Sequence, residues 1–168
     1  KTMKEAGCTF IGYGFESLSP TVLKSMQKPI TPQQIDQAFH ETLEIGIALQ
    51  AVFIFGDIAE TTETAEETLS YWKKNYQGQV ALGFIKPYPG SEIYNHCSRR
   101  GIIKDKLDFI KNKMNDPINM TENMTDKEFK KLRNDIIEAD GNYREYVSPI
   151  SIKKDKNKYE VEVKCPYC

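Results

Sequence analysis

Three apolar runs of strand length, each followed by a helix-like pattern, most constrain what this chain can fold into. They span residues 8–16, 49–55 and 80–85, and amphipathic segments of helical spacing separate them. Strands that alternate with helices at this spacing predict βαβ units and a parallel sheet, hence an α/β fold. Three strands are too few to close a barrel, since eight-stranded barrels need about 250 residues. A part-barrel and an open sheet both fit the pattern.

The composition is typical of a soluble globular protein that is large enough for one sizeable core. The 168 residues are 39% apolar and 28% charged, and the formal net charge is −1. This near-neutral balance argues against a nucleic-acid partner. No apolar run approaches the roughly 20 residues that span a bilayer. The cysteines lack the spacing of a disulfide scaffold and no signal-peptide pattern is present, which together favour a cytoplasmic protein.

Capping signals mark the expected helix starts. Residues 31–34, 64–67 and 125–128 each have the pattern of a capping box, which predicts that helices begin there. The helix that follows residue 125 is expected to bury one apolar face. That face would consist of Phe129, Leu132, Ile136 and Ile137.

The pattern changes twice along the chain, which predicts three regions. An α/β region is expected at 1–101 and a loop with a helical extension at 102–148. The tail at 149–168 alternates polar and apolar residues at 150–153 and 159–163, as a β-hairpin does. The ends, which begin without Met and finish inside a Cys-x-x-Cys pair, predict a piece of a longer protein with an N-terminal remainder.

Polar residues follow all three predicted strands at the point where each strand ends. The carboxyl ends of parallel strands meet at one edge of a sheet, where α/β proteins bind their ligands. Helices begin directly behind these ends, and their N-termini favour anionic groups. We therefore expect a binding site at this edge, with polar turns that serve only as connections as the alternative. The residues concerned are Glu16 and Ser17, Gly56 and Asp57 with Glu60, and Lys86 to Gly90.

Three segments resemble successive strand motifs of the radical S-adenosylmethionine enzymes. Residues 14–31, with Gly-Phe-Glu-Ser at their start, are similar to that family's fourth-strand segment. Residues 53–64 resemble its Gly-Leu-Pro-Gly-Glu-Thr motif, and residues 84–94, with Pro-Gly-Ser, resemble its sixth-strand segment. The likeness is strongest to the cobalamin-binding subgroup. It implies the C-terminal portion of a partial TIM-like (β/α) barrel that binds S-adenosylmethionine.

The resemblance also implies roles for individual residues. Glu16 and Ser17 would contact the ribose or the methionine end of S-adenosylmethionine, and Lys28 would face its carboxylate. Apolar residues of the second and third strands would line the adenine. Glu60 would bond backbone and hold its turn, or serve as a helix N-terminal acid. The complete set of implied cofactor-binding positions is Gly14, Glu16, Ser17, Lys28, Ile54, Phe55, Gly56, Ile85, Lys86, Pro87 and Tyr88.

The sequence departs from the family in one way that would prevent this chain from starting radical chemistry by itself. The Cys-x-x-x-Cys-x-x-Cys loop that holds a [4Fe-4S] cluster is not in the sequence, so any cluster ligands would lie outside this chain. No residue is therefore assigned a catalytic role. Asp57 and Ala59 replace the usual Leu and Gly, a smaller departure that affects the conformation of the second strand's turn.

The terminal Cys165-Pro-Tyr-Cys168 has the spacing of half a zinc site. A tetrahedral site needs two further ligands, which we expect beyond Cys168. A redox pair and two plain thiols are the alternatives. The two histidines, His40 and His96, are interpreted as structural or surface residues, and Cys8 and Cys97 as plain buried thiols.

Two functions from different classes remain open. In the first, the chain belongs to an enzyme that performs radical chemistry, or methyl transfer with cobalamin, on an unidentified small molecule, lipid or peptide. In the second, it is a non-catalytic α/β nucleotide-binding or scaffold module with a zinc-binding tail. A third reading makes the tail a zinc-dependent element that binds a partner, with the α/β part as its support.

Overall fold

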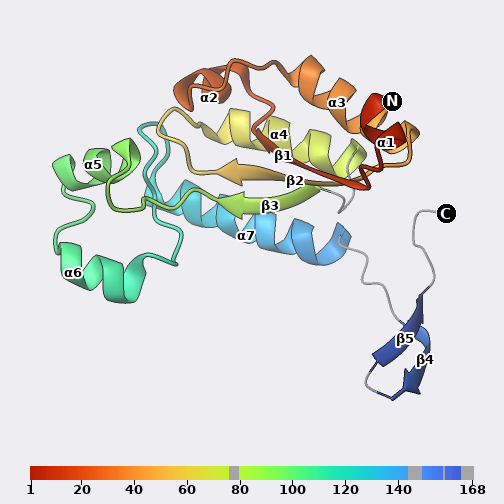
Figure 1. Ribbon diagram of the computed structural model, residues 1–168. Helices are drawn as coiled ribbons and strands as arrows, with labels where there is room; N and C mark the ends of the chain where they lie inside the picture. Colours follow the sequence, from red (N-terminus) through yellow and green to blue (C-terminus); the bar gives the residue numbers. More distant parts are fainter. Residues whose placement is uncertain (76–79, 144–148, 157, 164–168) are drawn as a thin grey trace.

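The chain forms an α/β body followed by a small β-hairpin (Figure 1). The computed structural model describes residues 1–75, 80–143, 149–156 and 158–163. The elements in order are α1 (Thr2–Glu5), β1 (Phe10–Glu16), α2 (Pro20–Ser25), α3 (Pro32–Glu44), β2 (Ala48–Phe55), α4 (Thr62–Asn75), β3 (Val80–Phe84), α5 (Glu92–Arg99), α6 (Lys106–Asp108), the π-helix η1 (Phe109–Lys113), α7 (Asp126–Tyr143), β4 (Pro149–Asp155) and β5 (Lys158–Val163).

The body is built on a parallel sheet whose strands lie in the order β1-β2-β3. Tyr13 of β1 is opposite Ala51 of β2, and Phe53 of β2 is opposite Leu82 of β3. Helices α2 and α3 connect β1 to β2, and α4 connects β2 to β3, as parallel pairing requires. The expected α/β class and parallel sheet are confirmed. The continuation of this sheet into a partial TIM-like barrel stays a prediction.

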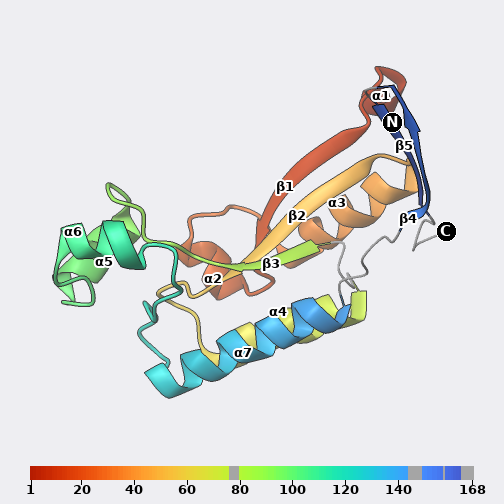
Figure 2. The ribbon, with the colours of Figure 1, turned by 90° about the horizontal axis from the view of Figure 1, so that it is seen from below.

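One hydrophobic core joins the sheet to helices α3, α4 and α7. Alternate strand residues such as Phe15, Phe53 and Phe55 belong to it, which leaves Gly14 and Ile54 on the opposite face of the sheet. Figure 2 shows α4 and α7 side by side below the strands. Trp72 of α4 is fully buried, and its indole N–H donates to the carbonyl of Val80 at 2.6 Å. Trp72 is therefore a core residue, which fits its place on the apolar side of α4.

Two of the three expected capping boxes are present. The Thr31 hydroxyl accepts from the Gln34 N–H while the Gln34 side chain accepts from the Thr31 N–H, and Thr125 and Glu128 exchange the same pair of bonds. The box expected at 64–67 is wrong. Helix α4 begins at Thr62, because the N–H groups of Thr61 and Thr64 each donate to the other's hydroxyl.

The apolar face expected on α7 is correct at Phe129, Leu132 and Ile136 but wrong at Ile137. Ile137 is 58% exposed, whereas Ala139 is buried in the core. The spacing explains the difference, since residues 132, 136 and 139 follow each other at four and three, and residue 137 lies a further 100° or so around the helix.

The regions beyond the sheet differ in how they bury apolar side chains. Helix α5, the π-helix η1 and the loops beside them form a second, smaller apolar cluster that includes Tyr94, Cys97 and Phe109. The tail is an antiparallel hairpin of β4 and β5, as expected. Its Ile150, Ile152, Tyr159, Val161 and Val163 are 49–65% exposed.

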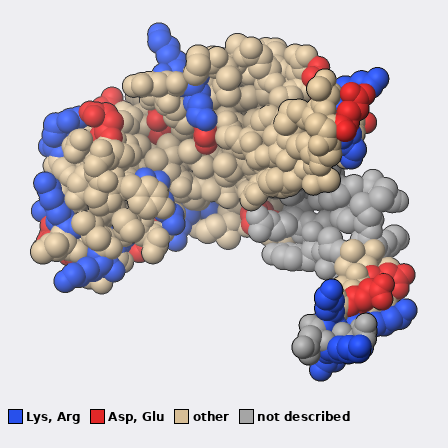
Figure 3. All heavy atoms as spheres, viewed as in Figure 1, with Lys and Arg blue, Asp and Glu red and all other residues tan. Residues whose placement is uncertain are grey.

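Charged side chains are unevenly distributed over the body. Figure 3 shows Lys and Arg gathered on the end formed by α5 and α6, with a largely uncharged surface between that end and the end at α1. Among the described residues, no helix is both long enough and apolar enough to cross a membrane.

Candidate functional site

A cavity of about 470 Å³ lies at the carboxyl ends of the three parallel strands. Each strand contributes to its wall, together with the end of α2 and the start of α5. The lining residues are Glu16, Ser25, Met26, Gln27, Lys28, Ile54, Asp57, Ile58, Ile85, Glu92 and Ile93. This is the edge at which the sequence predicts a binding site, and it is where parallel sheets bind ligands.

Glu16 reaches the cavity because β1 departs from regular pairing at its last residues. The register with β2 shifts between Gly14 and Glu16, and Glu16 has a φ of 64°, in the left-handed region that residues other than glycine rarely adopt. A Cβ on Gly14 would lie 2.5 Å from the Glu16 carboxylate and 3.0 Å from the Lys28 ammonium. Gly14 therefore makes room for both charged groups.

Lys28 is placed by the way in which α2 ends. The Lys28 N–H donates to the carbonyl of Leu23 at 2.9 Å and the Gln27 N–H to that of Lys24 at 3.1 Å, which is the Schellman pattern. Gln27 holds the left-handed position, with a φ of 56°, where glycine is usual. This turn directs Lys28 back over β1, where its ammonium lies 2.9 Å from the Glu16 carboxylate.

The apolar part of the wall comes from strand ends and from α5. Ile54 and Ile85, for which the resemblance implies contacts with adenine, both line the cavity. Ile58 and Ile93 add to this surface and were missed, because the first lies in a turn and the second in a helix that only tertiary packing brings near. Ile85 and Ile93 are held from behind by the second apolar cluster.

The β2–α4 turn adds the carboxylate of Asp57, a residue that the sequence places at this edge of the sheet without a specific cofactor contact. Asp57 lines the cavity, and one of its oxygens accepts from the Ala59 N–H at 2.9 Å. The turn is closed from within by Glu60, whose Oε2 accepts from the Gly56 N–H at 2.5 Å and whose own N–H donates to the Asp57 carbonyl.

The Glu60 carboxyl is buried to an unusual degree for an acid. It is 1% exposed. Burial, with a further contribution from nearby Asp57, raises the pKa of Glu60 from 4.5 to about 8, against the lowering effect of the Gly56 N–H. Desolvation disfavours the ionised form, so the group is mostly neutral at pH 7. The predicted backbone contact of Glu60 is present.

Several predicted cofactor positions do not line this cavity. The Ser17 hydroxyl is buried and accepts from the Ser19 N–H, and Phe55 belongs to the core. Lys86 donates to the Asn115 side chain, and Tyr88 is 54% exposed. Gly56 and Pro87 are likewise outside the lining. The structure therefore gathers Glu16, Lys28, Ile54 and Ile85 in one cavity, and leaves a ligand contact at the other positions as a prediction.

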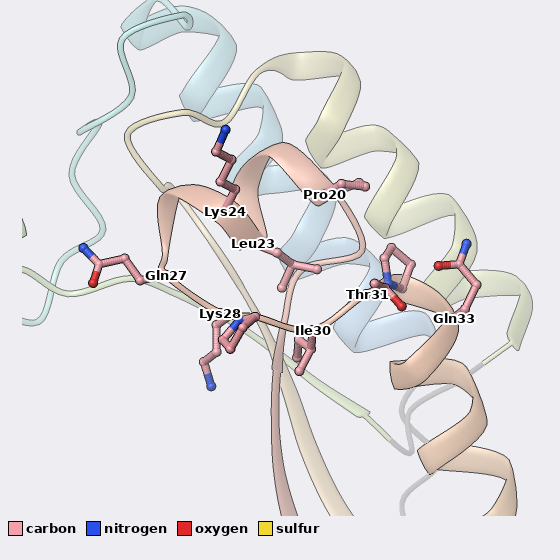
Figure 4. A pocket seen from close by; sticks show the side chains of 10 residues that line it. Pro20, Leu23, Lys24, Gln27, Lys28, Ile30, Thr31 and Gln33 are labelled. Atoms are coloured by element: carbon pink, nitrogen blue, oxygen red, sulfur yellow. The ribbon is translucent and has the colours of Figure 1, made fainter.

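A second hollow, of about 450 Å³, adjoins the cavity on the far side of the α2–α3 connection (Figure 4). Gln27 and Lys28 line both hollows, and Pro20, Leu23 and Ile30 make the second one largely apolar. The Lys24 and Lys28 side chains extend in opposite directions, and Lys28 is the one paired with Glu16 (Figure 4).

The predicted metal ligands Cys165 and Cys168 lie outside the described residues. Within the described part of the chain, no group of three or more His, Cys, Asp or Glu side chains could hold a metal ion. Cys97 is buried, and desolvation raises the pKa of its thiol, as expected for a plain buried thiol. Cys8 is only half-buried, so the expectation of burial is not met there.

The chain is similar in sequence to three methyltransferases. It is 30% identical over 132 residues to an uncharacterized methyltransferase of Pyrococcus horikoshii, which covers 79% of this chain and 28% of the relative. It is 27% identical to the bacteriochlorophyllide d C-8(2)-methyltransferase of Chlorobaculum tepidum, over 61% of this chain and 23% of the relative. It is 30% identical to the bacteriochlorophyllide d C-12(1)-methyltransferase of the same organism, over 56% of this chain and 21% of the relative.

These alignments span about a quarter of the length of the relatives. No protein-family model matches the chain. The names of the relatives state methyl transfer, and none of them states a radical mechanism, an iron–sulfur cluster or cobalamin. The expected membership of the radical S-adenosylmethionine family is contradicted by these findings. It is replaced by a similarity to methyltransferases.

Proposed function

We propose that this chain provides the S-adenosylmethionine-binding part of a methyltransferase. The observation that carries the proposal is the cavity at the strand ends, which combines a lysine–glutamate pair with an aliphatic wall. The methyltransferase names of the relatives support the same reading. S-adenosylmethionine supplies the methyl group and leaves as S-adenosylhomocysteine.

The residues of the cavity fit the chemical groups of this cofactor. Lys28 offers a cation to the methionine carboxylate, and Glu16 and Asp57 offer acceptors to the ammonium group or the ribose hydroxyls. Ile54 and Ile85 offer an apolar surface to the adenine. A cavity of about 470 Å³ falls within the usual range of roughly 300–1,000 Å³ for small-molecule sites.

Binding is tested by titration calorimetry of the full-length protein with S-adenosylmethionine and S-adenosylhomocysteine. Lys28→Ala removes the only cation that lines the cavity among the described residues, and at least tenfold weaker binding is expected. Lys24→Ala is the matched control, because Lys24 lines the neighbouring hollow and not this one. Equal affinity of wild type and Lys28→Ala would contradict the proposed role of Lys28.

Methyl transfer is tested separately with radiolabelled cofactor and candidate acceptors. The names of two relatives make chlorophyllide-type tetrapyrroles a reasonable first class of acceptor. A protein that binds S-adenosylmethionine and transfers no methyl group to any acceptor would fit the alternative function, a non-catalytic nucleotide-binding module.

A further inference from the structure

The β2–α4 turn contains a buried carboxyl that the proposed function leaves without a role. Glu60 lies behind the wall of the cavity and does not line it. Leaving a carboxyl in an apolar interior costs free energy unless a hydrogen bond compensates. A buried acid beside a ligand cavity therefore calls for a specific explanation.

The contacts of Glu60 all lead back to the turn that forms the cavity wall. Its Oε2 accepts from the Gly56 N–H, and its own N–H donates to the Asp57 carbonyl at 3.0 Å. Glu60 thus bonds to Gly56 through its side chain and to Asp57 through its backbone N–H, which closes the turn of residues 56–60. Asp57 and Ile58, which line the cavity, lie within this closed turn.

The Gly56 N–H needs a hydrogen-bond acceptor from another part of the chain. Gly56 follows the last residue of β2 and turns the chain with a φ of 98°, so its N–H lies beyond the strand pairing and needs a partner of its own. Phe129 of α7 lies against the same glycine, since a Cβ placed there would meet the phenyl ring at 3.4 Å. The ring offers no acceptor, and the Glu60 carboxyl provides one.

We propose that Glu60 is a positioning residue for the ligand cavity, which acts through the Gly56 N–H to hold Asp57 and Ile58 in the wall. This inference rests on the proposed function, because the ligand whose binding it supports is S-adenosylmethionine. The oxygen that accepts the hydrogen bond, and not the charge, is the part of Glu60 that matters.

The distinction between oxygen and charge can be tested by three substitutions. Glu60→Gln keeps the length and a carbonyl oxygen and cannot ionise, so it should bind S-adenosylmethionine within about threefold of wild type. Glu60→Asp keeps an ionisable carboxyl and shortens the reach, and Glu60→Ala removes the acceptor. Both should bind roughly tenfold or more weakly, because a buried N–H is left unpaired. Glu66→Ala, which changes an exposed acid of α4, the helix that follows the turn, is the matched control.

Calorimetry of the full-length protein measures the affinities, and amide hydrogen exchange at residues 56–59 reports on the turn itself. Faster exchange at these amides in Glu60→Ala, with unchanged exchange in Glu60→Gln, is expected. A Glu60→Ala variant that is folded and binds the cofactor as tightly as wild type would overturn this inference alone. A Glu60→Gln variant as weak as Glu60→Ala would overturn it too, because an acceptor oxygen at the same reach would then not be enough. A wild-type protein that binds no S-adenosylmethionine would overturn the proposed function, and this inference with it.

Discussion

The ends of β1 and β2 each place a carboxyl at the same edge of the sheet, and they do so in opposite ways. Glu16 faces the cavity, keeps a partly exposed side chain and pairs with a lysine at 2.9 Å. Glu60 is buried behind the wall and bonds to backbone, with its pKa raised to about 8. Neighbouring acids whose environments differ this much have different tasks. The comparison separates an acid that can meet a ligand from one that shapes the wall.

The largest expected effect is on the pH dependence of stability, and it comes from Glu60. Because its folded-state pKa is about 8 and its ordinary value is 4.5, the native state holds a proton that the unfolded chain has already released. Its contribution is fully present below pH 4.5, declines as pH rises to about 8 and is then lost. The decline amounts to on the order of 5 kcal/mol. Urea unfolding of Glu60→Gln between pH 4 and 9 should lack this decline, and an unchanged slope would contradict the buried neutral acid.

The next effect concerns the glycine beside Glu60. Gly56→Ala places a side chain on a residue with a φ of 98°, so the turn must strain or rearrange. We expect a loss of about 1–3 kcal/mol in the free energy of unfolding, accompanied by weaker cofactor binding. Thermal and urea unfolding measure the free energy of unfolding, and calorimetry measures cofactor binding. Gly141→Ala is the control, since that glycine has open space and no left-handed φ.

Gly14→Ala is the matching change at the end of β1, and it should act mainly on the ligand. The new Cβ would lie 2.5 Å from the Glu16 carboxylate, but the atoms in its way are the ends of flexible side chains. The charged pair can move aside, so the free energy of unfolding should fall by less than about 1 kcal/mol. Affinity for S-adenosylmethionine should fall at least tenfold. A large loss in the free energy of unfolding with unchanged affinity for S-adenosylmethionine would contradict this expectation, because Gly14 would then support the fold and not the ligand.

The smallest effect on stability is expected from the lysine of the pair. Lys28→Met keeps the length of the side chain and removes its charge. Exposed and half-exposed ion pairs contribute about 0.2–1 kcal/mol, so the free energy of unfolding should change by no more than that. A loss of several kcal/mol in urea unfolding would show that the Glu16–Lys28 pair, like Glu60, is part of what holds the fold together.

Local chemistry made much of the fold predictable. The alternation of strands and helices, the caps at Thr31 and Thr125 and the terminal hairpin follow from sequence patterns that act over a few residues. The errors arose where two local signals compete or where a side chain's fate depends on distant packing. Thr61 and Thr64 can both cap α4, and their mutual hydrogen bonds start the helix earlier than the Thr64 box suggests.

The candidate site was predictable in outline and not in detail. Glu16, Lys28, Ile54 and Ile85 share a cavity because the carboxyl ends of parallel strands must converge. The left-handed backbone at Glu16, which pairs it with Lys28, arises from the irregular end of β1. Asp57 was expected at this edge but without a specific ligand contact, because its orientation depends on Glu60 and on contacts with the segment before α7, where the Glu122 N–H donates to the Ile58 carbonyl.

The left-handed turn at Gln27 has a consequence for how this protein can be engineered. One residue ends α2, aims its neighbour at Glu16 and lines two adjoining hollows. Gln27→Gly would relax the backbone and at the same time remove a side chain from the lining of both hollows. Any substitution at Gln27 therefore changes the end of α2, the direction of Lys28 and the lining of both hollows together. The ligand selectivity of the cavity is better tuned at Ile58 or Ile93, each of which lines the cavity and not the second hollow.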